Sequence, residues 1–235
     1  LDLKDSYLSL DIANTSSGGD PLSKVWFGDK GGSAANVIER LVISSRSGQV
    51  LERIDRANLL SAIKMEWCHD SSYTRFGAGS AAGRSSSFTD LNWGRGSPPT
   101  KLRFCIPLSL ISPMIDSYDA LIPAQLASGM RFEFLLASAD AALASSNNDD
   151  TPTPQVLGYE ITNASMNVQS FLLSDVVLRT LNGMAAQSGL EVVCSSMYCA
   201  SGERTTDTLN LELGKASSRA LMCIYAEQEK TRASK

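Results

Sequence analysis

The single histidine of this chain, His69, stands between Cys68 and Asp70, and this trio is the first place to look for chemistry. A hydrolase built on a Ser-His-Asp site would have to use His69 as its base. No Gly-x-Ser-x-Gly elbow accompanies it in the sequence. We therefore expect His69 to be a loop histidine beside a helix end and not a general base.

The cysteines give an incomplete signal for metal binding. Zinc sites usually pair their ligands as CxxC or HxxxH, whereas Cys194 and Cys199 are separated by four residues and no second pair matches them. An odd number of cysteines at irregular spacing also argues against a disulfide framework. We expect reduced and mostly buried thiols at all five positions: Cys68, Cys105, Cys194, Cys199 and Cys223.

The glycine-rich run 77–83 resembles a phosphate-binding loop only superficially. It follows no convincing strand, opens no helix pattern and contains no GKS or GKT, so we expect a flexible loop. The carboxylate pairs Asp116/Asp119 and Asp149/Asp150 are typical of solvated loop charges, although calcium binding at 147–150 stays open. Two glycosylation sequons, at Asn14 and Asn163, lack a secretory leader to give them meaning.

No acid, base and nucleophile converge in this pattern, so the sequence predicts neither an enzyme nor a cofactor. With 43% hydrophobic residues, a chain of 235 residues can bury the core of one large β domain. The net charge is −4, and the first and last thirty residues contain no basic run, so no direct nucleic-acid contact is expected. No apolar run approaches the roughly 20 residues of a membrane span, and no signal-like leader opens the sequence.

Strands with a period of two are the dominant structural signal. Leu8, Leu10 and Ile12 alternate with polar residues, and the same pattern returns near residues 130–136 and 209–213. Uneven connections argue against a parallel βα rhythm. We predict an all-β, eight-stranded antiparallel jelly-roll sandwich with short helices in its long loops. Its strands are expected near 6–14, 36–44, 102–108, 130–139, 158–168, 190–199, 206–213 and 218–226.

Local signals refine this pattern. A change of parity within 158–168 predicts a bulge near Asn163. Asp55 is expected to cap a short helix, and Ser174 and Asp175 to open a longer one that runs to about Gln187. The first helix is predicted to bury Leu59, Leu60, Ile63 and Trp67. The second is predicted to pack within the chain through Val177, Leu178, Leu181, Met184 and Ala185.

The connection 109–129 is apolar yet broken by Pro113 and Pro123. It is predicted to form short helical turns whose side chains must be covered by their own domain or by a neighbour. We expect it to contribute to a subunit interface, together with the long Gly/Ser/Arg-rich loop 71–99. The interface residues expected in the connection are Leu110, Ile111, Met114, Ile115, Leu121, Ile122 and Leu126.

Three stretches carry a family resemblance. They are VIERLVISSRSGQVLERIDRANLL (37–60), RFCIPLSLISPMIDSYDALIPAQLASGMRFEFLL (103–136) and YEITNASMNVQSFLLSDVVLRTL (159–181). Their order of strand, turn, helix and Pro-broken loop resembles the jelly-roll major capsid proteins of tailless icosahedral viruses, the double-jelly-roll lineage of adenovirus hexon and the membrane-containing bacteriophages. In that lineage two rolls are fused in one chain of nearly twice this length.

The resemblance implies a structural coat protein that self-assembles into capsomers of an icosahedral virion. Residues 1–235 would form one jelly-roll domain, either alone or as half of a double roll, with a frayed tail at 227–235. Its partners would be copies of itself, as trimers or pseudo-hexameric capsomers, and other capsid proteins. It would fold in the host cell interior without membrane insertion. The alternative is a carbohydrate- or ligand-binding β-sandwich of the lectin kind, with Trp26, Trp93 and Tyr73 as scattered candidate contacts.

Overall fold

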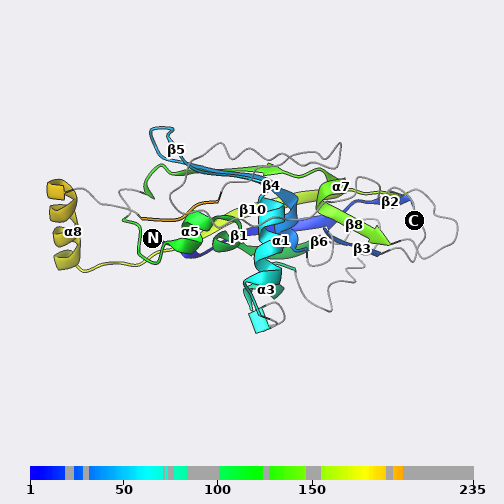
Figure 1. The fold of residues 1–235 in the computed structure, drawn as a ribbon, viewed down its shortest axis with the longest axis horizontal. Coiled ribbons are helices and arrows are strands. Elements are labelled where there is room, and N and C mark those ends of the chain that lie inside the picture. The colour runs from blue at the N-terminus through cyan, green and yellow to red at the C-terminus, as the bar shows by residue number, and fades with distance from the viewer. Residues whose placement is uncertain are drawn as a thin grey trace, which may run out of the picture.

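Two antiparallel three-stranded sheets form the body of the molecule (Figure 1). The computed structural model describes residues 1–18, 24–28, 32–70, 72–73, 77–83, 101–123, 127–146, 155–188 and 193–197. Within these residues the architecture consists of antiparallel β-strands with a few short helices, as expected for an all-β sandwich.

The first sheet is centred on β1 (Asp2–Asn14), which pairs with β10 (Tyr159–Gln169) on one side and β6 (Lys101–Pro107) on the other. The predicted alternation holds on the apolar side only, because Ser9 on the opposite face is also buried. Leu8, Leu10 and Ile12 of β1 are buried, and Leu8 and Leu10 lie opposite Ile106 and Phe104 of β6. The period of two therefore assigns one face of this sheet to the core.

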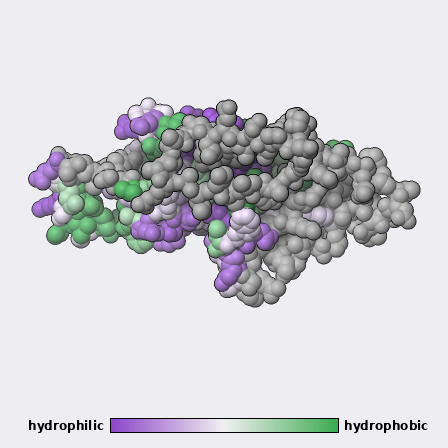
Figure 2. Space-filling view, viewed as in Figure 1, coloured by the Kyte–Doolittle hydropathy of each residue, from purple (hydrophilic) through white to green (hydrophobic). Residues whose placement is uncertain are grey.

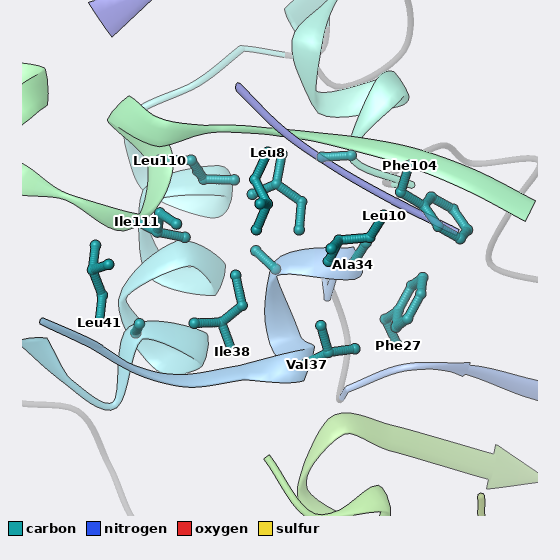
Figure 3. Packing of buried hydrophobic residues seen from close by; sticks show 14 of the residues in the cluster. Leu8, Leu10, Phe27, Ala34, Val37, Ile38, Leu41, Phe104, Leu110 and Ile111 are labelled. Carbon is teal, nitrogen blue, oxygen red and sulfur yellow. The ribbon is translucent and has the colours of Figure 1, made fainter. Parts of the chain in front are cut away.

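The second sheet is centred on β4 (Ile38–Ser44), with β5 (Val50–Asp55) and β7 (Arg131–Leu136) as its antiparallel neighbours. Leu41, Ile43 and Ile54 are buried on its inner face. Leu8 and Leu10 of the first sheet face Val37 and Ile38 across one continuous core (Figure 3). The two sheets thus share their apolar faces, as in a sandwich.

Two helical segments contribute to this shared core. They are α1 (Ala57–Trp67), which follows β5 directly, and α4 (Leu108–Ile111), which follows β6 directly. Leu110 and Ile111 lie beside the turns of α1 (Figure 3). A 3-10 turn, η1 (Ala34–Val37), precedes β4 and is closed by a capping box between Ser33 and Asn36.

The strands expected from the sequence are confirmed at five places, as β1, β4, β6, β7 and β10. Of the other three, those at 206–213 and 218–226 lie outside the described residues, and the one at 190–199 is described only at 193–197, where no strand forms. Four further short strands pair far along the chain: β3 (Lys24–Phe27) with β8 (Leu143–Ser146), and β2 (Ser17–Gly18) with β9 (Gln155–Val156). These strands have only two to four residues each, too few to show an alternation of apolar and polar side chains in the sequence.

The bulge predicted near Asn163 is confirmed. Ser9 pairs with Ser165 and Asp11 with Thr162, so β10 has one more residue than β1 between these pairs. Asn163 has φ 50, in the left-handed region that asparagine tolerates better than most residues. Because of this extra residue, the side chains of β10 on both sides of the bulge lie on the same faces of the sheet as their partners in β1.

The predictions for α1 are wrong in two respects. Arg56, with φ 72, precedes the helix without a side-chain cap, while Asp55 instead accepts hydrogen bonds from Arg40 and Arg53. The fully buried face consists of Ala57, Ser61, Lys64 and Met65. Of the predicted face, Leu60 is partly buried against the core, Leu59 and Ile63 are half-buried, and Trp67 is 67% exposed. Small side chains at the start of this face permit close packing on the neighbouring η1, and periodicity alone does not reveal that preference.

Candidate functional site

The apolar connection 109–129 is largely a core element of a single chain. Leu110, Ile111 and Ile115 are at most 3% exposed. Met114 and Ile122 are partly buried against the same core, Leu121 is 41% exposed, and Leu126 lies outside the described residues. The expected interface is therefore corrected for Leu110, Ile111 and Ile115, because side chains packed inside one chain are not available to another.

Two short helices fold the connection inward, as its broken apolar pattern predicted. α4 follows Pro107, and α5 (Pro113–Ser117) begins with proline at its first position, where no hydrogen-bond donor is needed. Ser112 caps α5 by accepting a hydrogen bond from the Ile115 amide at 3.2 Å. The turn between α4 and α5 lets Leu110, Ile111 and Ile115 all reach the core.

A buried carboxylate binds this connection to the second sheet. Glu52 of β5 is only 3% exposed. It accepts hydrogen bonds from the Ser112 hydroxyl and, at 2.8 Å, from the Met114 amide. Its Oε1 also accepts a hydrogen bond at 2.8 Å from the hydroxyl of Ser196, which is distant in sequence. Three donors compensate for the loss of water around this carboxylate.

A buried lysine binds the same connection from α1. Lys64 is 6% exposed, and its Nζ donates to the Ser109 carbonyl at 2.6 Å and to Asp116 Oδ2 at 2.7 Å. The Asp116 side chain is 44% exposed, so this ion pair lies at the edge of the core. We call Glu52, Lys64, Ser112 and Asp116 the polar clamp, because together they fix α4 and α5 in place.

The clamp also holds a short segment from the C-terminal part of the chain, residues 193–197, which we call the strap. Besides the Ser196 contact to Glu52, the Ser195 amide donates to Ser117 Oγ at 2.8 Å. Cys194 lies in the strap, and partial loss of solvent around its thiol, together with the charge of Glu52, raises the pKa of this thiol. Segments 78 residues apart in sequence are therefore joined at the end of α5.

Sequence reasoning missed the clamp, although parity carried part of the signal. In β5, Glu52 has the same parity as the inward-facing Ile54, and in α1, Lys64 lies on the face of Ala57 and Ser61. A charged residue at an inward position is informative because it is rarely buried without partners. Those partners, Ser112 and Ser196, could not be inferred from spacing.

The longer predicted helix is present as α8 (Asp175–Ser188), but its apolar stripe is not packed as expected. Val177 and Met184 are 44% and 53% exposed, Leu178 is 37% exposed, and Leu181 is partly buried. α8 lies at one end of the molecule, away from the two sheets (Figure 1). Hydrophobic residues gather on its visible surface (Figure 2).

His69 stacks on an aromatic ring. Its imidazole lies parallel to Tyr73, with ring centroids 3.8 Å apart and planes 10° from parallel. Burial, and secondly the positive charge of Lys64, lower the pKa of His69 below its ordinary 6.5. Asp70 accepts a hydrogen bond from the Tyr73 amide at 2.8 Å. These contacts give His69 a packing role at the end of α1.

The remaining candidate ligands are dispersed. Cys68 and Cys194 are exposed free thiols and Cys105 is partly buried, so the expectation of mostly buried thiols is wrong for the first two; Cys199 and Cys223 lie outside the described residues. Asp116 and Asp119 bind different lysines, Lys64 and Lys4, and do not form a carboxylate pair. Among the described residues, no three His, Cys, Asp or Glu side chains group as metal ligands. Residues 147–150 lie outside them.

The glycine-rich run is a packed turn and not a flexible loop. α3 (Ala78–Ala81) lies within it, and Ala82 is fully buried. Gly83 has φ +86, and a Cβ there would approach the Phe104 ring to 2.9 Å. Glycine is required at this position for both reasons.

Both sequons have structural roles. Asn14 is 6% exposed and accepts a hydrogen bond from the Ser16 amide, and Asn163 donates to Asp11 at the bulge. Of the aromatic candidates for sugar binding, Trp26 is partly buried, Tyr73 stacks on His69, and Trp93 lies outside the described residues. The described part of the chain therefore presents no aromatic platform made by these three residues.

Comparison of the chain with protein-family models, with curated proteins and with solved structures found no match. Within the described residues, no helix combines the length and the apolar character that crossing a membrane requires.

Proposed function

We propose that this chain is a structural coat protein of an icosahedral virus, which assembles with copies of itself into capsomers, and that its two sheets belong to one eight-stranded jelly roll. The observation that supports this proposal is the arrangement of β1, β4, β6, β7 and β10 in two antiparallel sheets around one core. Such a sandwich is a rigid body from which long connections project, as building modules require.

The order of elements adds support from the three stretches that resemble capsid proteins. The first stretch forms β4, β5 and the start of α1; the second forms β6, α4, α5 and β7; the third forms β10 and the first half of α8. Each contains the strands, turns and helices that its own sequence pattern predicts. Because one fold serves many functions, this support rests on analogy.

The test is assembly of the purified full chain. Sedimentation velocity over a range of protein and salt concentrations should reveal discrete closed oligomers, and the fraction of chains in them should increase with protein concentration. Negative-stain electron microscopy should show particles of uniform size. A folded chain that stays monomeric at its highest soluble concentration would contradict the proposal. A glycan array on the same sample tests the lectin alternative, and selective binding of a glycan would favour that alternative.

A further inference from the structure

The two long flanks of the sandwich are covered to different degrees. On the first flank, the polar clamp joins β5 of one sheet to the segment that follows β6 of the other, since Glu52 accepts a hydrogen bond from the Met114 amide at 2.8 Å. The inward side chains of these two edge strands are covered: Ile54 of β5 is 3% exposed and Ile106 of β6 is fully buried. This flank is therefore closed.

The opposite flank consists of β7 and β10. The Tyr159 hydroxyl, at the start of β10, donates to the Ala137 carbonyl, just after the end of β7. Within the residues that the structure describes, β7 pairs with β4 and β10 pairs with β1, and the outer edge of each pairs with no further strand. An open edge of this kind carries backbone donors and acceptors that a further strand can use.

Strand register shows that this second flank leaves part of the core exposed. Leu8 of β1 lies between Ile106 of β6 and Met166 of β10, in one row across the first sheet. Exposure along this row rises from 0% at Ile106 through 6% at Leu8 to 39% at Met166. In the second sheet, Ile38 is fully buried, whereas its partner Leu136 in β7 is 47% exposed. The inward positions of β7 and β10 therefore need further cover.

The edge of β7 is better suited to a further strand than that of β10. β10 carries the bulge at Asn163, and a bulge hinders pairing at an edge. β7 and the residue before it present Met130, Phe132 and Phe134 at every second position, each partly buried against the core. A strand added here needs apolar side chains at the same spacing, with polar side chains between them.

Residues 206–213 of the same chain, which lie outside the described residues, have this pattern in their sequence. Leu209, Leu211 and Leu213 alternate with polar residues. The strap binds β5 through Ser196, and eight residues, 198–205, separate it from this segment. From residue 197 to residue 206 an extended chain reaches about 30 Å. Two strand spacings, from β5 to β7, amount to about 10 Å, so the segment can reach the open edge.

One antiparallel register matches both faces of β7. With Leu211 opposite Phe132, the apolar side chains of both strands point to the core. The same register places Glu212 opposite Arg131, so that opposite charges face each other on the outer side. The further pairs in this register are Leu209 with Phe134, Leu213 with Met130, and Asn210 with Glu133.

The two neighbouring registers are less favourable. A shift of two residues in one direction places Glu212 opposite Glu133, and like charges directly opposite each other destabilise a strand pair. A shift of two residues in the other direction turns Asp207 toward the core beside Phe134. In the favoured register Asp207 falls beside Leu136, which is 47% exposed, so the carboxylate stays in contact with water.

We propose that residues 206–213 pair antiparallel with the open edge of β7, as the fourth strand of the second sheet, with Leu211 opposite Phe132. The inference rests on the eight-stranded roll of the proposed function and gives one of its strands a defined place. The occupant of the edge is a segment of the same chain and not a second copy, because the strap already holds the chain within reach.

Two cysteine pairs in the full chain test this placement. Glu133→Cys with Asn210→Cys brings together two positions that are opposite in the proposed register, where Cβ atoms lie about 4.5–5.5 Å apart. Glu160→Cys with Asn210→Cys is the matched control, because Glu160 is an equally exposed position on the edge strand β10. After mild oxidation, peptide mapping by mass spectrometry should find the 133–210 disulfide within one chain in more than half of the molecules, and at least fivefold more often than the 160–210 disulfide.

Each other result overturns the inference. A 133–210 bond only between two chains would make a second copy the occupant of the edge. Equal yields of both bonds, or a higher yield for the control, would assign the segment to β10 or to neither edge, as would the absence of both bonds. Sedimentation of the wild type is independent of these yields. Assembly without the 133–210 bond leaves the coat-protein proposal in place, whereas this bond in a monomeric wild type removes that proposal and keeps the strand assignment.

Hydrogen exchange tests the same pairing without new thiols. Leu211→Asp places a carboxylate beside Phe132 and should release the strand, so that amides of 131–136 exchange at least tenfold faster than in the wild type. Thr208→Asp makes the same charge change at an outward position of the proposed strand and should leave this exchange within about twofold. Exchange in the central strand β1 should be unchanged in both variants, which excludes global unfolding. Equal exchange in 131–136 for the two variants would contradict the proposed pairing.

Discussion

Residues 108–117, which form α4 and α5, and the helix α8 are both apolar segments that follow a strand, yet the first is buried and the second is largely exposed. Leu110, Ile111 and Ile115 are buried, whereas Val177 and Met184 are about half exposed. The sequence pattern predicted the opposite: an interface role for the segment after β6, and packing of α8 within its own chain. Apolar content alone therefore does not decide which segment belongs to the core.

Polar groups from other elements hold the buried segment in place. Ser112, Asp116 and the Met114 amide of the connection find Glu52 and Lys64, two charged groups from other elements that face inward. These hydrogen bonds satisfy the backbone and side chains of a non-regular segment, which can then enter the core. In α8, the Thr180 hydroxyl donates to the Val176 carbonyl of the same helix at 3.0 Å.

The largest contrast should come from matched truncations in the two segments. Ile111→Ala creates a cavity in the core and should lower the free energy of unfolding by about 2–5 kcal/mol. Leu178→Ala removes a side chain that is 37% exposed and should change it by about 0.5 kcal/mol or less. Urea denaturation of both variants measures the difference. Equal losses would mean that α8 is as much a part of the core as α4.

Glu52 should rank next, because its removal leaves several donors without acceptors. Glu52→Ala should lower the free energy of unfolding by about 2–4 kcal/mol, and the isosteric Glu52→Gln by less, about 1–2 kcal/mol. Both should increase hydrogen exchange in the strap, at Ser195 and Ser196. If exchange in 193–197 is unchanged, Glu52 supports α5 alone and does not hold the strap.

Lys64 should have a smaller effect. Lys64→Met keeps the aliphatic stem but leaves the Ser109 carbonyl without this donor, at an expected cost of about 1–2 kcal/mol. Asp116 is 44% exposed and can regain water, which limits the loss. Arg179→Met on α8 is the matched control and should stay within about 0.5 kcal/mol. A loss from Arg179→Met as large as that from Lys64→Met would remove the distinction between the two segments.

The smallest effect concerns Asp11 of β1, which accepts a hydrogen bond from Asn163 at the bulge of β10. Hydrogen bonds from Arg103 and Asn163 lower the pKa of Asp11 to about 2 from its ordinary 3.8. Because the folded pKa lies below the unfolded one, this contribution is complete above pH 3.8 and is lost as the pH falls to about 2. Between pH 3.8 and about 2, the free energy of unfolding of the wild type should therefore fall more steeply with decreasing pH than that of Asp11→Asn. Identical pH profiles would show that the ionised carboxylate of Asp11 does not stabilise the folded chain.

Local patterns predicted much of the strand layout and little of the site. Alternation located β1, β4, β6, β7 and β10, and the parity slip located the bulge at Asn163, because both follow from the geometry of a single strand. The face of α1 was predicted only in part: Leu60 packs against the core, but the fully buried positions include the small residues Ala57 and Ser61, which a pattern of large hydrophobic residues does not reveal. The strap was missed because its partners are 78 and 144 residues away in sequence.

By itself, then, the sequence determined the five long strands β1, β4, β6, β7 and β10, the broken helices of 108–117 and the amphipathic helix α8, since each depends on the spacing of neighbouring residues. Only the tertiary structure decided which apolar surface is covered and which is left outside. That choice depends on Glu52 and Lys64 meeting groups distant along the chain, and on the first sheet closing over the second. Burial is a property of the whole packed chain, because each side chain competes for a limited interior that must also satisfy every polar group within it.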